Sequence, residues 1–244
     1  MAIKLIALDM DGTLLNSDET ISAVNHDTIT RALAKDVQVV LSTGRSFDTC
    51  FSYAESLNLT SYLITCNGGE IWTVDNELIE RHLLRPERVQ EMWERAENLN
   101  LNTWMISTDG VWRGMYPDNF SSHDWLKFGC DSEDPAALDT FIEELSYYDD
   151  LELANSLPTN IEINPKGVHK ASALESVCER LNITLDNVLA IGDSLNDMKM
   201  IQEAGIGVAM GNAQEAIKNV AADVTDTNEQ HGVSRAIEKY VLGD

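Results

Sequence analysis

The first third of the chain alternates short apolar runs with segments of helical periodicity. Apolar runs at 3–8, 37–41 and 62–65 predict buried strands, and the residues at 21–33 and those leading to 57 have helical spacing. Strands that are apolar on both faces are typical of parallel sheets covered by helices. The pattern therefore predicts an α/β fold.

The last third repeats the same alternation. Apolar runs at 188–191 and 206–209 predict two further strands, and helical spacing is found at 170–181, 213–220 and 233–241. We expect these strands to join the sheet that the first third begins.

The middle of the chain has a different order of elements. Segments 86–99 and 135–147 are predicted helices, and each precedes a predicted hairpin, at 103–107 with 111–115 and at 151–154 with 160–163. This order, helix-strand-strand twice, predicts an α+β unit inserted into the α/β domain. We expect residues 1–83 and 161–244 to form one discontinuous core and residues 84–160 the inserted unit.

The bulk composition is that of a soluble globular protein. The 244 residues are 43% hydrophobic and 24% charged, and no apolar run reaches the roughly 20 residues of a membrane span. The apolar start of the chain is too short for a signal peptide, so a cytoplasmic location is expected. The four cysteines lie far apart without a C-x-x-C pair, which indicates reduced core thiols rather than a zinc or redox site.

The net charge of −24 restricts the partners that we expect. So negative a field repels nucleic acid and anionic lipid, which excludes both as predicted partners. It also repels a phosphorylated metabolite, so a site for one would need a metal ion and local cations. Nothing in the sequence indicates the oligomeric state.

Two carboxylates stand where the first predicted strand ends. Asp9 and Asp11 have the i, i+2 spacing that points side chains the same way, and Gly12 permits a sharp turn. Open α/β sheets bind ligands at this carboxyl edge, and two close carboxylates require a cation or a shared proton. The alternative interpretation is a solvated Asp-Gly turn.

A second acidic loop follows the predicted strand at 188–191. Asp193 and Asp197 are candidate ligands of Mg²⁺, which prefers carboxylate oxygens and could also use Asp9 and the main-chain carbonyl of Asp11. Helix capping by Asp193 is the alternative.

Two weaker motifs complete the candidate site. Ser42-Thr43-Gly44-Arg45 offers hydroxyls and turn amides to a phosphate, although a helix cap would look the same. Lys170 begins a predicted helix, where the helix dipole disfavours a cation. This position indicates a role in holding the nucleophile and a phosphate. A solvated lysine is the alternative interpretation.

These four motifs, in this order, resemble those of the haloacid dehalogenase superfamily. About 28 residues separate the first two motifs, and about 125 separate the second from Lys170. This spacing resembles the Cof-type phosphatase branch, whose α/β cap lies in the longer interval. Asn67-Gly68-Gly69 likewise resembles the asparagine-glycine loop of that branch. The resemblance implies a Rossmann-like core with residues 84–160 as the cap.

The resemblance also implies a role for each residue. Asp9 would attack phosphorus, Asp11 would protonate the leaving group and then activate water, and Lys170 would neutralise charge. Ser42 matches the phosphate-binding hydroxyl better than Thr43. Ser194 stands where many relatives have asparagine. The implied phosphate- or substrate-binding set is Ser42, Thr43, Gly44, Arg45, Asn67, Gly68 and Asn196, and the implied Mg²⁺ set is Asp9, Asp11, Asp193 and Asp197.

By resemblance, the expected function is Mg²⁺-dependent hydrolysis of small phosphorylated metabolites. Sugar phosphates are the first expectation, with riboflavin-pathway phosphates, flavin mononucleotide and pyridoxal phosphate as alternatives. A phosphomutase of the same superfamily and a non-enzymatic, receiver-like Mg²⁺-binding module remain open. In the cap, Arg113 and His123 are candidate substrate contacts, as are Trp112 and Tyr116, whereas Trp93 and Trp104 are expected in the cap interior.

Overall fold

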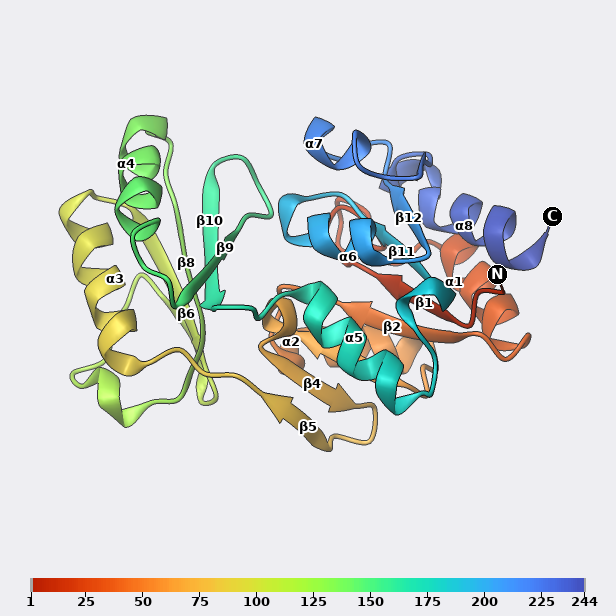
Figure 1. Cartoon of the computed structure of the whole chain (residues 1–244), viewed down its shortest axis with the longest axis horizontal. Helices are drawn as coiled ribbons and strands as arrows, with labels where there is room; N and C mark the ends of the chain where they lie inside the picture. Colours follow the sequence, from red (N-terminus) through yellow and green to blue (C-terminus); the bar gives the residue numbers. More distant parts are fainter. Residues whose placement is uncertain (1, 244) are drawn as a thin grey trace.

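The computed structural model describes residues 2–243, which form two β-sheets (Figure 1). The larger sheet has eight strands in the order β13-β12-β11-β1-β2-β3-β4-β5. Its strands are β1 (Leu5–Leu8), β2 (Gln38–Ser42), β3 (Tyr62–Thr65), β4 (Glu70–Thr73), β5 (Leu78–Arg81), β11 (Val188–Gly192), β12 (Ile206–Ala209) and β13 (Asp223–Val224).

The strands from β13 to β3 are parallel, which confirms the predicted α/β fold. Two features of this sheet were not predicted. The antiparallel hairpin β4–β5 extends the sheet beyond β3, and the two-residue strand β13 closes the other edge. Both were missed because their sequences have no sustained apolar run.

Helices cover both faces of the larger sheet. Ile6 and Leu8 pack in one hydrophobic core with residues of α1, α2 and α8, while Leu5 and Ala7 pack in another with residues of α5. Because alternate residues of β1 are buried on opposite faces, the strand is apolar throughout. The helices of this unit are α1 (Ala23–Leu33), α2 (Phe47–Ser56), α5 (Lys170–Arg180), α6 (Met198–Glu203), α7 (Glu215–Lys218), α8 (Gly232–Ile237) and the π-helical η6 (Glu238–Leu242), with short 3-10 turns at η1 (Cys66–Gly68), η3 (Leu185–Asn187), η4 (Leu195–Asp197) and η5 (Asn228–Gln230).

The smaller sheet is antiparallel, with five strands in the order β7-β6-β8-β10-β9. Helices α3 and α4 lie on the side of this sheet that faces away from the larger unit (Figure 1). The elements are α3 (Pro86–Asn98), β6 (Asn102–Ser107), β7 (Gly110–Arg113), the 3-10 turn η2 (Phe120–Ser122), β8 (Trp125–Asp131), α4 (Pro135–Leu145), β9 (Leu151–Ala154) and β10 (Asn160–Pro165).

The predicted order of helix-strand-strand, repeated twice, was wrong in one respect. A further strand, β8, follows the first hairpin and pairs with both β6 and β10 at the centre of the smaller sheet. Its apolar run contains Lys127 and Gly129, which concealed it in the sequence. Strand β10 also pairs within this sheet as far as Pro165, five residues beyond the expected boundary at 160.

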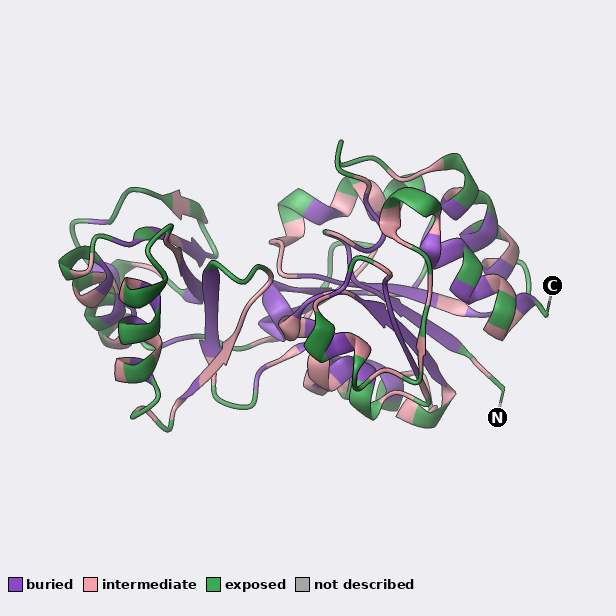
Figure 2. Ribbon diagram, turned by 90° about the horizontal axis from the view of Figure 1, so that it is seen from above, coloured by how far each residue is buried: buried purple, intermediate pink, exposed green. Residues whose placement is uncertain are grey.

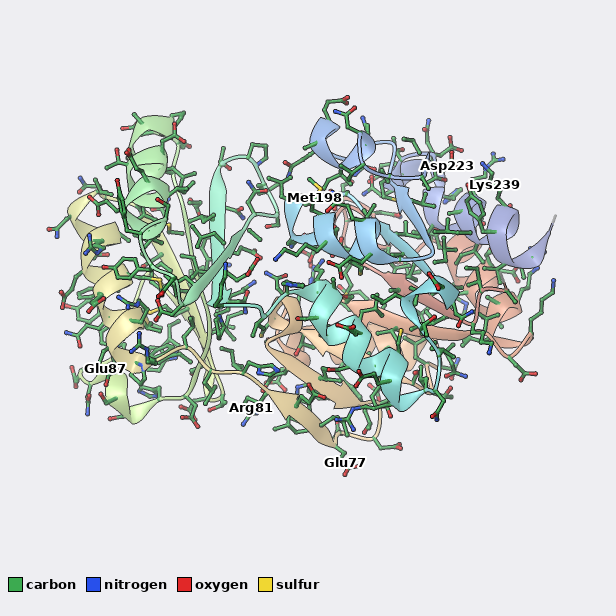
Figure 3. The ribbon with its side chains drawn as sticks, in the orientation of Figure 1. Glu77, Arg81, Glu87, Met198, Asp223 and Lys239 are labelled. Atoms are coloured by element: carbon green, nitrogen blue, oxygen red, sulfur yellow. The ribbon has the colours of Figure 1, made fainter. Side chains whose placement is uncertain are left out.

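Most buried hydrophobic residues of each unit lie between its sheet and its helices (Figure 2). The chain leaves the larger sheet after β5, where Arg81 donates from Nε to the buried carboxylate of Glu70 over 2.7 Å (Figure 3). This bond fixes the last strand before the chain crosses to α3. Among the described helices, none combines the length and the apolar character that a bilayer span requires.

Candidate active site

The candidate site lies at the carboxyl edge of the parallel sheet. Leu8 of β1 pairs with Leu41 of β2 on one side and with Ile191 of β11 on the other. Asp9, the next residue after β1, therefore lies between the ends of the two neighbouring strands. Adjacent parallel strands thus bring together three motifs that are far apart in the sequence.

Lys170 connects two of the predicted acidic residues. Its Nζ donates to Asp9 Oδ1 over 2.6 Å and to Asp197 Oδ1 over 2.7 Å. The lysine side chain is fully buried at the start of α5, and both carboxylates are almost fully buried. A buried ammonium requires such partners, so this lysine is not the solvated residue of the alternative interpretation.

Asp197 also organises the loop after β11. Its Oδ2 accepts from the main-chain amides of Asp193 over 3.0 Å and Ser194 over 3.2 Å. The Ser194 hydroxyl in turn donates to Asp193 Oδ1 over 2.9 Å. Ser194 therefore holds the carboxylate of Asp193 in place.

Three carboxylates meet at this edge of the sheet. One oxygen from each of Asp9, Asp193 and Asp197 lies within 4.8 Å of the others. Burial, followed by the charge of Asp197, raises the pKa of Asp9 well above its usual value and the pKa of Asp193 to about 7. Burial would lower the pKa of Lys170, but Asp197 and Asp9 raise it overall.

This set of oxygen donors fits a divalent cation. The three carboxylates face one ammonium, so the cluster has more acidic groups than Lys170 can neutralise. Hard cations such as Mg²⁺ bind carboxylate oxygens of this kind. The carboxylate of Asp11 lies outside the cluster, so only its main-chain carbonyl remains a candidate ligand from this residue.

Gly12 allows the two acidic loops to approach each other. It adopts φ of +80°, and a Cβ atom there would lie 2.5 Å from Asp193 Oδ2. Any side chain at this position would therefore displace the carboxylate. Both the turn and the close contact require glycine.

Asp11 is held apart from Asp9 by an arginine. Arg45 donates from Nε to Asp11 Oδ2 over 2.9 Å and from Nη2 to Asp11 Oδ1 over 2.6 Å, a bidentate pair. The side chain of Asp11 is 54% exposed. The i, i+2 spacing predicted that Asp9 and Asp11 lie at one sheet edge. In this structure, however, their carboxylates pair with different basic side chains, that of Asp9 with Lys170 and that of Asp11 with Arg45.

The predicted phosphate-binding residues surround the same edge. Ser42 ends β2, and its buried hydroxyl has no hydrogen-bond partner among the described residues, whereas the Thr43 hydroxyl accepts from the main-chain amide of Arg45 over 3.1 Å. Asn196 donates to Asn67 Oδ1 over 3.4 Å, and its own Oδ1 is buried without a partner among residues 2–243. Ser42 is thus the freer of the two hydroxyls. Gly44, beside Arg45, and Gly68, beside Asn67, lie in the same two loops.

Two charged residues of the smaller unit were missed by the sequence analysis. Lys127 on β8 and Glu162 on β10 are buried, and Lys127 Nζ lies 3.3 Å from Glu162 Oε2. Lys127 also donates to the main-chain carbonyl of Gly44 over 2.7 Å, and Asn67 Nδ2 donates to Glu162 Oε2 over 2.6 Å. The smaller unit therefore contacts two loops of the candidate site. In the sequence, a charged residue within an apolar run was the signal that could have identified Lys127 and Glu162.

A cleft of about 990 Å³ lies between the two units. Asp9, Asp11 and Asp193 line it from the larger unit, and Trp104 and Arg113 line it from the smaller one. The expectation that Trp104 belongs to the interior of the smaller unit was therefore wrong. Its side chain is on the face of the sheet opposite to the helices, whereas Trp93 packs against the interior as expected, and Trp112, Tyr116 and His123 line a second, smaller hollow.

Comparison with known proteins identifies the family. The family model described as haloacid dehalogenase-like hydrolase matches residues 6–123 and 115–237. The chain is 52% identical over 240 residues to 5-amino-6-(5-phospho-D-ribitylamino)uracil phosphatase YcsE of Bacillus subtilis (strain 168), covering 98% of this chain and 96% of that protein. It is 30% identical to Phosphatase YwpJ of the same organism, over 98% and 100% of the two chains.

A solved structure has the same architecture. The haloacid dehalogenase-like hydrolase from B. subtilis superposes with a TM-score of 0.91 at 28% identity, covering 98% of this chain and 100% of that one. With nearly the whole chain superposed, that structure agrees with the arrangement of a parallel core sheet and an inserted unit. The chain therefore belongs to the haloacid dehalogenase superfamily, in its Cof-type phosphatase branch.

Proposed function

We propose that this enzyme is a Mg²⁺-dependent phosphatase that hydrolyses small phosphorylated metabolites through an aspartyl-phosphate on Asp9. The observation that carries the proposal is the buried contact of Lys170 with both Asp9 and Asp197, next to Asp193. Lys170 favours the ionised form of Asp9 and holds one of its oxygens, leaving the other available for attack.

The reaction has two steps. In the first, the pair of Asp11 with Arg45 opens and Asp11 carries a proton; an Asp9 carboxylate oxygen then forms a bond to phosphorus, the bond from phosphorus to the ester oxygen breaks, and Asp11 gives its proton to that oxygen. In the second, Asp11 takes a proton from water, whose oxygen attacks phosphorus and displaces the Asp9 carboxylate. Bound Mg²⁺, held by Asp9, Asp193, the Asp11 carbonyl and, directly or through water, Asp197, would offset the negative charge of the phosphoryl group.

The expected contact of Arg45 with phosphate stays a prediction, because Arg45 pairs with Asp11 in this structure. Both of its hydrogen bonds in this structure go to Asp11, so a direct contact of Arg45 with phosphate requires that pair to open. We assign phosphate binding first to the unpaired hydroxyl of Ser42 and to Lys170, and next to the neighbouring loops at Gly44, Asn67–Gly68 and Asn196.

The substrate class is that of phosphate monoesters of sugars and sugar alcohols. Sugar phosphates were the first expectation from the sequence. The relative that is 52% identical is named for a phosphorylated ribitylaminouracil, and this supports extending the class to sugar-alcohol phosphates that carry a ring. We propose that the cap, residues 84–160 extended to the end of β10 at Pro165, closes over the site and selects the leaving group.

The nucleophile assignment is tested with Asp9→Asn. We expect release of inorganic phosphate from a panel of phosphorylated metabolites with Mg²⁺ to fall at least about a thousandfold, because the amide cannot form the phosphoenzyme. Asp75→Asn, in the exposed turn between β4 and β5, is the matched control and should retain full activity. Unchanged turnover by a folded Asp9→Asn variant would refute the proposal. Isomerisation of a hexose phosphate without phosphate release would identify a phosphomutase instead.

A further inference from the structure

The smaller sheet turns one face toward its helices and the other toward the cleft. Met105 of β6 and Phe128 of β8 are buried in the hydrophobic core with residues of α3 and α4. Trp104 and Gly129, their neighbours along the two strands, are therefore on the cleft side. On this face Lys127 reaches the core loop at Gly44, whereas Trp104 and Gly129 carry no catalytic group, so we expect them to face the part of the substrate away from phosphorus.

Trp104 and Gly129 form a flat surface on this face. The two residues are direct partners in the register of β6 and β8. A Cβ atom at Gly129 would lie 2.3 Å from Trp104 Cε2 and 2.4 Å from Cζ2, so the indole lies directly against the glycine backbone. Only glycine leaves room for the indole at this contact, and the ring also borders the cleft.

At the edge of this surface, two side-chain donors have no hydrogen-bond acceptor among the described residues. Within residues 2–243, the Trp104 N–H makes no hydrogen bond, whereas the N–H groups of Trp112 and Trp125 donate to Ser107 and Phe120. Arg113, the cross-strand neighbour of Trp104 on β7, has its Cζ 5.9 Å from the indole centre and pairs with no carboxylate of the described residues. Two donors are thus available to acceptor atoms of a ligand.

The cleft next to Trp104 has an apolar flank, while Lys127 and Glu162, the register partners of Ile106 and Gly129, line it with charged groups. Ile106 and Val111, which are partners in the register of β6 and β7, line the cleft next to Trp104. These side chains offer nothing to the hydroxyl groups of a sugar ring, which would lose their bonds to water there. A planar ring with hydrogen-bond acceptors on its edge can stack on the indole, contact the apolar flank and accept hydrogen bonds from both donors.

We propose that Trp104, lying on Gly129, is the binding surface for a planar nitrogen heterocycle with carbonyl groups, carried by the leaving group of the substrate. The heterocycle stacks on the indole while the Trp104 N–H and the Arg113 guanidinium donate to its carbonyl oxygens. This inference rests on the proposed phosphatase function and adds the part of the leaving group that distinguishes one phosphate ester from another.

The test compares two substrates with the same phosphorylated ribityl chain, one of which carries an aminouracil group where the other has a hydroxyl. They are 5-amino-6-(5-phospho-D-ribitylamino)uracil and D-ribitol 5-phosphate. We expect Trp104→Ala to lower kcat/KM about tenfold or more for the ring-bearing ester, in line with the usual contribution of one stacked base, and to change that for ribitol phosphate less than about twofold. Trp104→Phe, which keeps an aromatic ring, should recover most of the difference.

Two further variants separate stacking from general damage to the cap. Gly129→Ala should reproduce much of the effect of Trp104→Ala, because the new methyl group displaces the indole. Trp112→Ala removes an indole from the next strand on the opposite face and should leave the ratio of the two kcat/KM values unchanged. An equal loss of activity on both substrates with Trp104→Ala would overturn the proposal.

The outcome for the wild-type enzyme distinguishes this inference from the proposed function. Hydrolysis of both esters with no preference for the ring would refute the binding surface and leave the phosphatase function intact. If neither ester is hydrolysed, the phosphatase proposal fails for this class. Calorimetric titration with the phosphate-free 5-amino-6-(D-ribitylamino)uracil then decides the binding surface alone: weaker binding to Trp104→Ala supports it, and equal or absent binding refutes it.

Discussion

The ammonium of Lys127, at the centre of the cap sheet, donates to the main-chain carbonyl of Gly44 in the catalytic core over 2.7 Å. The same ammonium contacts Glu162, which accepts from Asn67 of the core. The cap is therefore joined to two loops of the active site by one buried pair of charges. Since both side chains are almost completely buried, neither can lose its partner without a large cost in free energy.

Lys127→Met should destabilise the protein by about 3 kcal/mol, because it leaves the charge of Glu162 buried without a cation. Adding Glu162→Gln should restore part of that loss, since the amide carries no charge. Chemical unfolding of the two single variants and the double variant measures this coupling. Lys166→Met, at a mostly exposed lysine, is the control and should change stability by less than about 0.5 kcal/mol. Purely additive effects would show that the two residues act independently.

The same pair predicts a loss of stability in acid. Burial raises the pKa of Glu162, but Lys127 and the hydrogen bond from Asn67 outweigh it and hold the pKa below its ordinary value of 4.5. Since the folded pKa is depressed, the stabilisation is present above about pH 4.5 and is lost as the pH falls through the folded value. Wild-type protein should therefore exceed Glu162→Gln in unfolding free energy near pH 6, and the difference should shrink below pH 4.5. A constant difference from pH 6 to pH 3 would contradict this.

Magnesium should stabilise the folded protein through the three carboxylates. At a Mg²⁺ concentration of about ten times Kd, the gain is about 1.4 kcal/mol, which corresponds to a rise in Tm of about 3–5 °C for a chain of this length. Asp193→Asn should abolish most of this rise, and Asp75→Asn should preserve it. Scanning calorimetry with and without a chelator provides the measurement. Equal shifts in both variants would place the cation elsewhere.

Gly12→Ala should lower kcat/KM strongly and the free energy of unfolding only moderately. The new Cβ would lie 2.5 Å from Asp193 Oδ2, so the carboxylate must move, and a displacement of about 1 Å can lower kcat/KM about a hundredfold. The backbone strain at positive φ adds about 1–3 kcal/mol of destabilisation. Gly167→Ala, at φ of +77° with no atom within 4 Å of its Cβ, carries the same strain without the contact. Similar kcat/KM values for the two variants would show that the contact with Asp193 is unimportant.

The sequence alone was sufficient for the fold of the core and the placement of most candidate residues. Apolar runs followed by acidic or hydroxyl-bearing motifs indicated strand ends, and the ends of adjacent parallel strands lie at one edge of the sheet by geometry. Asp9, Ser42 and Asp193 are therefore neighbours because each lies at the end of its own strand, and each strand can be predicted from its own sequence. The position of the cap followed in the same way from the long interval before Lys170.

Only the tertiary structure decided which groups are in contact. The central strand β8 was hidden by Lys127 and Gly129, and the carbonyl that Lys127 binds is 83 residues away in the chain. Arg45 binds Asp11, and Trp104 lies toward the cleft rather than in the cap interior. The contact of Lys127 depends on how the two units pack against each other, and that of Arg45 with Asp11 on how two loops of the core meet. A side chain's own sequence neighbours determine neither.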